Sequence, residues 1–327
     1  MKTPRLTLTC MLLTLIGALP AMAGPRTFVS GLGNDANPGT REQPKRTFAS
    51  ALAVTDPGGE IVALDSAGFA SSTLAINKSV SIIAPAGLYA GVRVTSGNAI
   101  TISGAADTVV TLRGLTIIGQ GFSTGHGVHF TAGAALHIQD CTISGFFVRG
   151  VECQNVPEAA EVYISNTTVR NGRSNGAAFG AAAGGSLKVT IRNSHFLDNQ
   201  LTGAQFNAGV VAVVSESQAN GNNSNGFEVG FGTATVTQSV ASQNRLAGFS
   251  SFNQGTLNID HCTASQNGFD GLAKVSGTAG PGIMRISNSI VTNNGRLGFN
   301  GSPESLGNNL VRGNVGGDGT STIVPGL

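Results

Sequence analysis

The residues in this sequence that are best suited to chemistry are His129, Arg149 and Glu152, with His126 close by. His129 and Glu152 each stand two residues after a glycine, in the segments GVHF and GVEC, which begin 23 residues apart. If these segments are neighbouring strands, the histidine lies about 5 Å from the carboxylate and can act as a general base, while Arg149 holds an anionic group. These three are therefore our candidate catalytic residues. The alternative is a cross-strand surface ion pair, which contributes little to stability.

The other carboxylates do not form a second catalytic group. Glu228 occupies the same position as Glu152 but three repeats later, which corresponds to about 14 Å at about 4.8 Å per repeat. Hydrolysis of a glycosidic bond by two carboxylates requires them to lie about 5 to 9.5 Å apart. The sequence has no zinc-ligand spacing, phosphate-binding loop or nucleophile elbow, so we predict no metal site and no cofactor.

A repeat of 22 to 27 residues must position these side chains. Its first residues are Gly127, Gly150, Gly176, Gly203, Gly226, Gly248, Gly271 and Gly298. Side chains alternate across a strand, so the second residue after each glycine should point away from the core. This outward ladder consists of His129, Glu152, Ala178, Gln205, Glu228, Ser250, Ala273 and Asn300. We interpret it as one candidate face for a substrate.

The content of each repeat predicts the fold. It holds short runs in which apolar and polar residues alternate, which is the period of a strand, and Gly, Asn and Ser separate the runs at turns. A period of this length indicates a solenoid, because one unit cannot bury its apolar side alone. The sequence resembles the right-handed parallel β-helix of the pectate-lyase-like superfamily over residues 27–311. The resemblance implies an all-β solenoid. For a calcium-dependent lyase of that superfamily, the resemblance would imply a cluster of Asp and Glu with a basic residue nearby. This sequence has no such cluster.

Three further columns recur at fixed places in the repeat. One is a polar turn column, which we interpret as structural: Asp140, Asn166, Asn193, Glu216, Gln238, His261 and Asn288. The second is an asparagine column with the same interpretation: Asn199, Asn222, Asn244, Asn267 and Asn294. The third is a column of small inward side chains: Cys141, Thr167, Ser194, Ser217, Ser239, Cys262 and Ser289. Cys141 and Cys262 lie too many coils apart for a disulfide, and a Cys141–Cys153 bond has no support.

The ends of the chain differ from the repeats. Residues 1–23 have a basic start, an apolar stretch and a small-x-small site at Ala21-Met22-Ala23, which predicts a secretory signal cleaved near Ala23. Residues 24–60 should form a strand, a loop and a short helix that caps the solenoid, with Phe48, Ala51 and Leu52 on its buried face. We assign residues 61–311 to the β-helix and 312–327 to a C-terminal tail or cap. The small-residue stretch at residues 177–186 is interpreted as a loop that bulges from one coil.

Composition excludes several classes of protein. Charged residues make up 11% of the chain and are balanced in sign, with no run of Lys or Arg, so we predict no nucleic-acid binding. No stretch is long and apolar enough to span a membrane. There are two Tyr and no Trp, so an aromatic sugar-binding platform is not evident.

These observations lead to two expectations of function. The first is an exported bacterial β-helix protein, secreted or periplasmic, that is non-catalytic and presents a rigid face to a polysaccharide or cell-surface glycan. The second is a polysaccharide lyase or glycoside hydrolase whose site is formed by His129, Arg149 and Glu152. A purely structural or adhesive module is a third possibility. The oligomeric state is not encoded in any pattern that we find.

Overall fold

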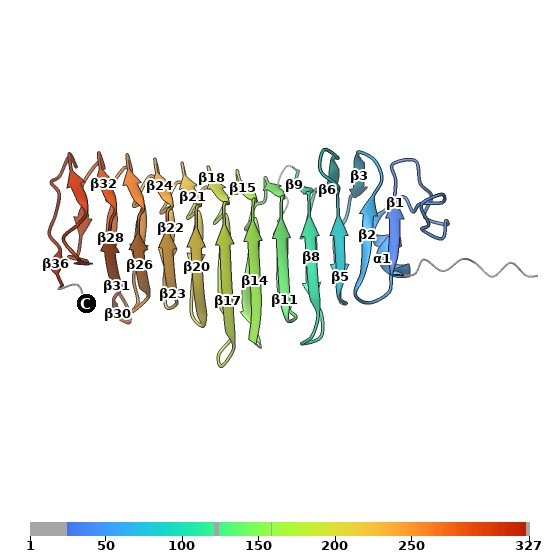
Figure 1. Cartoon of the computed structure of the whole chain (residues 1–327), viewed down its shortest axis with the longest axis horizontal. Coiled ribbons are helices and arrows are strands. Elements are labelled where there is room, and N and C mark those ends of the chain that lie inside the picture. The colour runs from blue at the N-terminus through green and yellow to red at the C-terminus, as the bar shows by residue number, and fades with distance from the viewer. Residues whose placement is uncertain (1–24, 121–123, 158, 325–327) are drawn as a thin grey trace, which may run out of the picture.

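The chain forms an elongated parallel β-helix, shown along its length in Figure 1. The computed structural model describes residues 25–120, 124–157 and 159–324, so the predicted signal at residues 1–23 lies outside the described residues. Three long parallel sheets and one short antiparallel pair account for its strands, and the only helix among the described residues is α1 (Phe48–Val54).

The three sheets run along the solenoid, and each coil between its ends contributes one strand to each sheet. The thirteen-stranded sheet contains, in spatial order, β1 (Arg26–Val29), β2 (Gly59–Ala63), β5 (Val80–Ile83), β8 (Val109–Arg113), β11 (Ala135–Gln139), β14 (Ala159–Ser165), β17 (Ser186–Arg192), β20 (Val210–Ser215), β23 (Thr233–Thr237), β26 (Thr256–Asp260), β31 (Ile283–Ser287), β34 (Glu304–Ser305) and β36 (Thr322–Ile323). The eleven-stranded sheet contains β3 (Ala67–Ala70), β6 (Ala90–Val94), β9 (Leu115–Gly119), β12 (Thr142–Ser144), β15 (Thr168–Arg170), β18 (His195–Leu197), β21 (Gln218–Asn220), β24 (Val240–Ser242), β27 (Thr263–Ser265), β32 (Ile290–Thr292) and β35 (Leu310–Arg312).

The ten-stranded sheet carries the glycine-led repeats. It contains β4 (Leu74–Ile76), β7 (Ile100–Ser103), β10 (Val128–Ala132), β13 (Val151–Val156), β16 (Ala177–Ala181), β19 (Ala204–Phe206), β22 (Phe227–Val229), β25 (Phe249–Ser251), β28 (Leu272–Lys274) and β33 (Phe299–Asn300). β29 (Ser276–Gly277) and β30 (Gly280–Pro281) form the antiparallel pair, a small hairpin between two coils. The all-β solenoid predicted from the repeat is confirmed.

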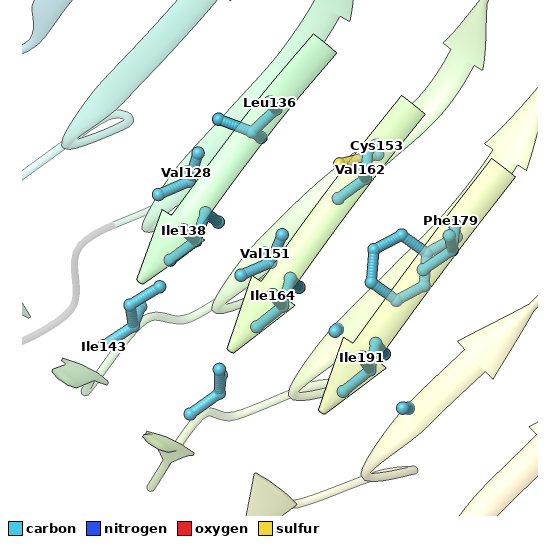
Figure 2. Packing of buried hydrophobic residues seen from close by; sticks show 14 of the residues in the cluster. Val128, Leu136, Ile138, Ile143, Val151, Cys153, Val162, Ile164, Phe179 and Ile191 are labelled. Atoms are coloured by element: carbon cyan, nitrogen blue, oxygen red, sulfur yellow. The ribbon is translucent and has the colours of Figure 1, made fainter. Parts of the chain in front are cut away.

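The core is a stack of identical layers. Equivalent residues of successive coils are Cα partners, for example Val128 with Val151 and Ile138 with Ile164, and all four are completely buried. Figure 2 shows these side chains as inward columns, with Phe179 in the next coil. The Phe179 and Phe206 rings stack with centroids 5.5 Å apart. Each coil therefore shields the apolar side of its neighbour, which is why an isolated repeat could not fold.

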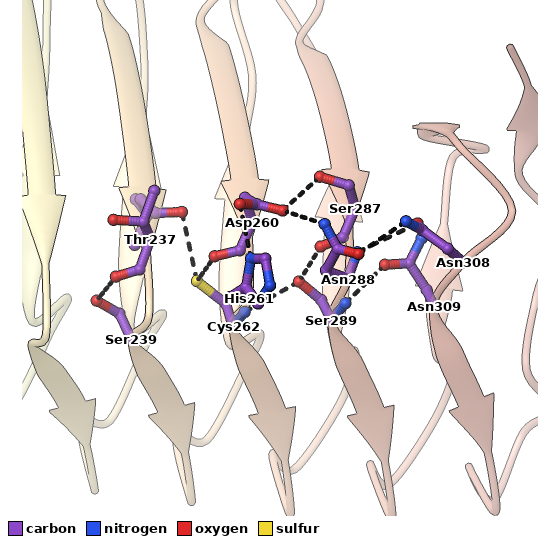
Figure 3. A network of polar contacts seen from close by, with 11 residues as sticks. Thr237, Ser239, Asp260, His261, Cys262, Ser287, Asn288, Ser289, Asn308 and Asn309 are labelled. Atoms are coloured by element: carbon purple, nitrogen blue, oxygen red, sulfur yellow. Dashed lines mark hydrogen bonds and ion pairs between the residues drawn. The ribbon is translucent and has the colours of Figure 1, made fainter. Parts of the chain in front are cut away.

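The predicted polar turn column connects the thirteen-stranded sheet to the eleven-stranded sheet. All seven of its residues have left-handed backbone, with φ between 45° and 54°. The column of small side chains comes one residue later in each coil and points inward. The Ser194 amide donates to Ser217 Oγ at 3.1 Å, and the Cys262 amide donates to Ser289 Oγ at 3.0 Å, the second of which is drawn in Figure 3. Cys141, Cys153 and Cys262 are buried and free, as expected for packing residues.

The asparagine column connects the eleven-stranded sheet to the ten-stranded sheet and is also structural. Asn244 Oδ1 accepts from the backbone and side-chain nitrogens of Asn222, and Asn244 Nδ2 donates to Asn267 Oδ1, each at 3.0 Å. Asn222, Asn244 and Asn267 are at most 1% exposed. The buried amides thus satisfy turn backbone groups of the preceding coil, which water cannot reach.

The predicted capping helix is confirmed at the N-terminal end. Thr47 is its N-cap and accepts from the Ser50 amide, and the buried side chains are Phe48, Ala51 and Leu52. The Phe48 ring packs against Phe69 of β3 with centroids 5.0 Å apart. β1 pairs directly with β2, so solenoid pairing already begins at Arg26.

Candidate functional site

The ten-stranded sheet positions the candidate residues, and its glycines explain why. A Cβ atom on Gly150 would lie 2.7 Å from the carbonyl oxygen of Gly176 in the next coil and 2.2 Å from Val169 Cγ1. A Cβ on Gly203 would likewise lie 2.7 Å from the Gly226 oxygen. No side chain fits in such a space, so only glycine allows the coils to approach at this corner.

The outward ladder faces away from the core, as predicted, but is largely covered. Its residues point away from the core but none is exposed; Glu152, Ala178, Ser250 and Ala273 are at most 5% exposed, and the others are half-buried. The predicted outward direction is confirmed, but this face is not open to solvent. The strands here are only two to six residues long, and side chains from the preceding turn, such as Arg149 and Asn225, lie over the ladder and contact it.

The predicted candidate residues do come together. His129 and Glu152 are Cα partners on β10 and β13. Arg149 Nη1 lies 2.6 Å from Glu152 Oε2, and His126 Nδ1 lies 4.0 Å from the same oxygen. The His126 and His129 rings stack with centroids 4.7 Å apart. Sequence reasoning missed one member: Asn98 Nδ2 donates to His129 Nδ1 at 3.2 Å.

Burial sets the protonation of this cluster. The Glu152 side chain is 6% exposed, and this desolvation raises its pKa, while the charge and hydrogen bond of Arg149 oppose the rise. Burial, followed by the charges of His129 and Arg149, lowers the pKa of His126 to about 4. Burial also lowers the pKa of His129. Both imidazoles are therefore neutral near pH 7, and because His129 Nδ1 accepts from Asn98, its other nitrogen carries the proton. His129 presents a donor rather than a free base in this arrangement.

The two other carboxylates of this face are also engaged by the fold. Glu228 accepts from Gln205 Nε2 at 2.7 Å and from Asn225 Nδ2 at 2.5 Å. Asp270 pairs with both Arg296 nitrogens Nε and Nη2 and also accepts from Asn300 Nδ2 at 3.1 Å. Glu152 and Glu228 are separated by three coils, which is about 14 Å and outside the range of paired catalytic carboxylates.

Neither a metal-binding cluster nor a membrane-spanning helix is found in the described residues. Within residues 25–120, 124–157 and 159–324, no three His, Cys, Asp or Glu side chains lie close enough together to hold a metal. In the same part of the chain, no helix has the length and hydropathy needed to cross a bilayer.

An exposed edge borders the ten-stranded sheet and was not recognised from the sequence. We call it the turn edge; it comprises the connections from the eleven-stranded to the ten-stranded sheet at residues 145–149, 171–175, 198–202, 221–225, 243–247, 266–270 and 293–297. Apolar side chains protrude from it: Phe147 is 46% exposed, Leu201 47%, Leu246 38% and Phe269 46%. The Arg173 guanidinium lies 5.9 Å from the Phe147 ring centroid, and that of Arg296 lies 5.5 Å from Phe269. Leu201, Leu246 and Phe269 each lie two residues after an asparagine of the column, and that fixed offset was the available signal.

The sequence pattern described as "Right handed beta helix region" matches residues 90–263 and 179–321, which together cover more than half of the chain. The chain belongs to this right-handed β-helix family. The match gives the handedness of the solenoid and confirms the predicted resemblance. A comparison with curated proteins finds no match.

Solved structures share the architecture at low sequence identity. The enzymatically active domain of tailspike protein 2 from bacteriophage CBA120 aligns with a TM-score of 0.53 and 14% identity over 80% of this chain and 42% of its own. The Dettilon tailspike protein aligns at 0.50 with 13% identity, over 84% of this chain and 63% of its own. Pectate lyase Pel9A aligns at 0.46 with 18% identity, over 86% of this chain and 67% of its own. This chain therefore spans less than half of the phage CBA120 domain. At these identities the likeness is one of fold.

Proposed function

We propose that the protein is a non-catalytic β-helix that binds an extended glycan along its ten-stranded sheet and the adjoining turn edge. The observation that carries this proposal is that the carboxylates of this face are bound by other side chains of the protein. Glu152, Glu228 and Asp270 are each held by partners from the fold. Glu152 and Glu228 are three coils or about 14 Å apart, outside the range of paired catalytic carboxylates, and His129 Nδ1 accepts from Asn98. The face keeps polar groups but no free acid-base pair.

The form of the surface favours a long ligand. Exposed Phe147, Leu201, Leu246 and Phe269 recur along the axis, at separations of two, two and one coils, or about 10, 10 and 5 Å. The apolar faces of sugar rings stack on such side chains, and half-buried amides beside them, such as Gln205, can hydrogen-bond hydroxyl groups. A rigid row of this kind matches a repeating polymer better than a compact metabolite.

A binding assay with two matched variants tests the proposal. Phe269→Ala removes a 46%-exposed ring from the turn edge, and Phe231→Ala removes a 52%-exposed ring from the connection between β22 and β23, at the opposite edge of the same sheet. We expect saturable binding to at least one extended glycan, measured by calorimetry, that weakens about tenfold in Phe269→Ala and is unchanged in Phe231→Ala. Equal losses in both variants, or no binding to any glycan in a broad panel, would contradict the proposal.

The alternative function, a polysaccharide lyase or glycoside hydrolase, is supported by one observation. His126 and Arg149 lie beside the buried carboxylate of Glu152, and His129 is the Cα partner of Glu152 on the neighbouring strand. Perturbed titratable groups gather at active sites, although structural ion pairs produce the same signature. Its test is the appearance of unsaturated products or new reducing ends, and their loss in Glu152→Gln.

Export is a separate proposal supported by residues 1–23, whose pattern is that of a secretory signal. Expression of the full sequence in a bacterium with an envelope should yield a periplasmic or secreted protein that begins at Gly24. Intact-mass measurement of a cytoplasmic product that retains Met1 or Lys2 would contradict it.

A further inference from the structure

The charges of the solenoid are distributed unevenly between its faces. On the thirteen-stranded sheet and the turn that follows it, basic side chains pair with carboxylates of a neighbouring coil: Arg26 with Glu60, Arg113 with Asp140, Lys188 with Glu161, Arg192 with Glu216 and Arg285 with Glu304. These pairs cancel the charge of that face.

The eleven-stranded sheet and the turn edge carry a different set, the arginine row, which consists of Arg93, Arg170, Arg245 and Arg312. Arg93 and Arg170 occupy one register position in β6 and β15, Arg245 follows β24, and Arg312 ends β35. Successive members are three coils apart, or about 14 Å. All four are solvent-exposed, and within the described residues none of them forms an ion pair. Asp198, on the same edge, has an exposed carboxylate that forms no ion pair with an arginine in the described structure.

A cavity lies at the N-terminal end of the arginine row. Its volume is about 480 Å³, within the range of ordinary ligand sites. Two guanidinium groups from distant parts of the chain line it: Arg93 from β6 and Arg46, which precedes α1. The other polar lining residues are Thr47, Ser71, Thr95 and Gln120, and no carboxylate belongs to the lining. We call this cavity the arginine pocket.

Both arginines are held in place with donors to spare. Arg46 Nη1 donates to the Gly68 carbonyl at 2.8 Å. With the Gln120 amide turned so that its oxygen faces Arg93, that oxygen accepts from Arg93 Nη2 and Nε at 3.2 and 3.3 Å. A guanidinium has five N–H donors, so each keeps further donors for a ligand. The carboxylate of Asp35 is outside the lining and is bonded to the amides of Arg46 and Thr47 at the start of α1.

We propose that the arginine pocket binds the carboxylate or sulfate group of an acidic glycan, whose chain then follows the arginine row along the solenoid. This inference rests on the proposed glycan-binding function. Planar guanidinium groups recognise oxyanions with two parallel hydrogen bonds, and two of them in one cavity without a carboxylate favour a negative group. Because the row is exposed, its contribution falls as salt screens it.

The experiment compares three polymers of similar length: polygalacturonate, which carries carboxylates, dextran sulfate, which carries sulfates, and neutral dextran. The protein is the mature chain, and the variant is the double change Arg46→Gln with Arg93→Gln. Arg192→Gln, which removes a paired arginine from the opposite face, is the matched control. Urea unfolding of all three proteins confirms that each is folded.

We expect at least one acidic polymer to bind at least tenfold more tightly than dextran, and the preference between the two identifies the oxyanion. The double variant should lose at least tenfold in affinity for that polymer and the control should lose less than twofold, with the difference shrinking as NaCl is raised. If dextran binds as tightly as the acidic polymers and the double variant is unaffected, the arginine pocket is refuted while the glycan-binding function stands. If no polymer binds, the arginine pocket is refuted, and the broad glycan panel described above then decides the glycan-binding function. If duplex DNA competes as well as the best glycan, the assignment to a glycan is refuted in favour of general polyanion binding.

Discussion

Replacement of Asn244 by alanine should strongly destabilise the solenoid. The side chain is completely buried and makes four hydrogen bonds: two from Asn222 to its Oδ1, and one each from its Nδ2 to Ala219 O and Asn267 Oδ1, at 2.8 to 3.0 Å. The amide of Asn222, which is 1% exposed, loses the acceptor that the side chain provides. At about 1 kcal/mol net per bond, with an added penalty for a buried orphaned donor, the loss is about 3–5 kcal/mol.

The matched control is Asn223→Ala, which changes the next residue along the chain. Asn223 is exposed, so its truncation should alter the free energy of unfolding by less than about 0.5 kcal/mol. Urea unfolding followed by circular dichroism gives the two free energies, and hydrogen exchange reports whether the Asn222 amide becomes unprotected. If Asn244→Ala is as stable as Asn223→Ala, the asparagine column does not hold the coils together and the structural interpretation of these turns is wrong.

Three further predictions concern the buried polar groups. Arg149→Met leaves the carboxylate of Glu152 buried without its partner and should lower the free energy of unfolding in urea by about 3 kcal/mol. The double variant that adds Glu152→Gln should recover more than half of this loss. Additive losses would show that the two side chains do not interact. The pKa of His126 is about 6.5 in the unfolded chain and about 4 in the folded protein, so the folded state should lose about 3 kcal/mol of stability as the pH falls from 6.5 to 4. His126→Gln should flatten this part of the profile of unfolding free energy against pH. An unchanged profile would contradict the burial of the His126 side chain. Burial raises the pKa of Cys153 well above its ordinary value, so its thiol should react with a disulfide reagent only after unfolding, and rapid labelling of the native protein would contradict its place in the core.

Much of the architecture was predictable because it depends on spacing. The glycines at positions such as Gly150 and Gly203 recur where no side chain fits between coils, so they reveal both the period and the register. Thr47 and the apolar face of Phe48 and Leu52 likewise encode the capping helix locally. These features require no knowledge of distant contacts.

Other features depended on contacts that a repeat cannot encode. The stretch at residues 177–186 was predicted to be a loop, but Ala177–Ala181 is strand β16, because Phe179 packs into the core column and small side chains are accommodated beside it. Only residues 182–185 form the turn. The strands Ala67–Ala70 and Leu74–Ile76 are only four and three residues long, too short for an alternating pattern to be recognised without their neighbours.

The candidate site was predicted in position but not in environment. The repeat placed His129 beside Glu152, and this was confirmed. The burial of Glu152 beneath Arg149 and the contact with Asn98 depend on how turn side chains fold over the ladder. The arginine row was not found because its members are separated by many tens of residues and align only when the chain is coiled.

The most direct test of the account measures binding and bond cleavage in one reaction. Mature protein is mixed with the tightest-binding glycan from the panel at a concentration that saturates it, and reducing ends and unsaturated products are followed over several hours. We predict full occupancy with product formation no faster than in a sample without protein, because the proposed non-catalytic function leaves Glu152, Glu228 and Asp270 engaged by their partners from the fold. Steady product release that disappears in Glu152→Gln would contradict the account and establish the cluster at His129, Arg149 and Glu152 as an active site.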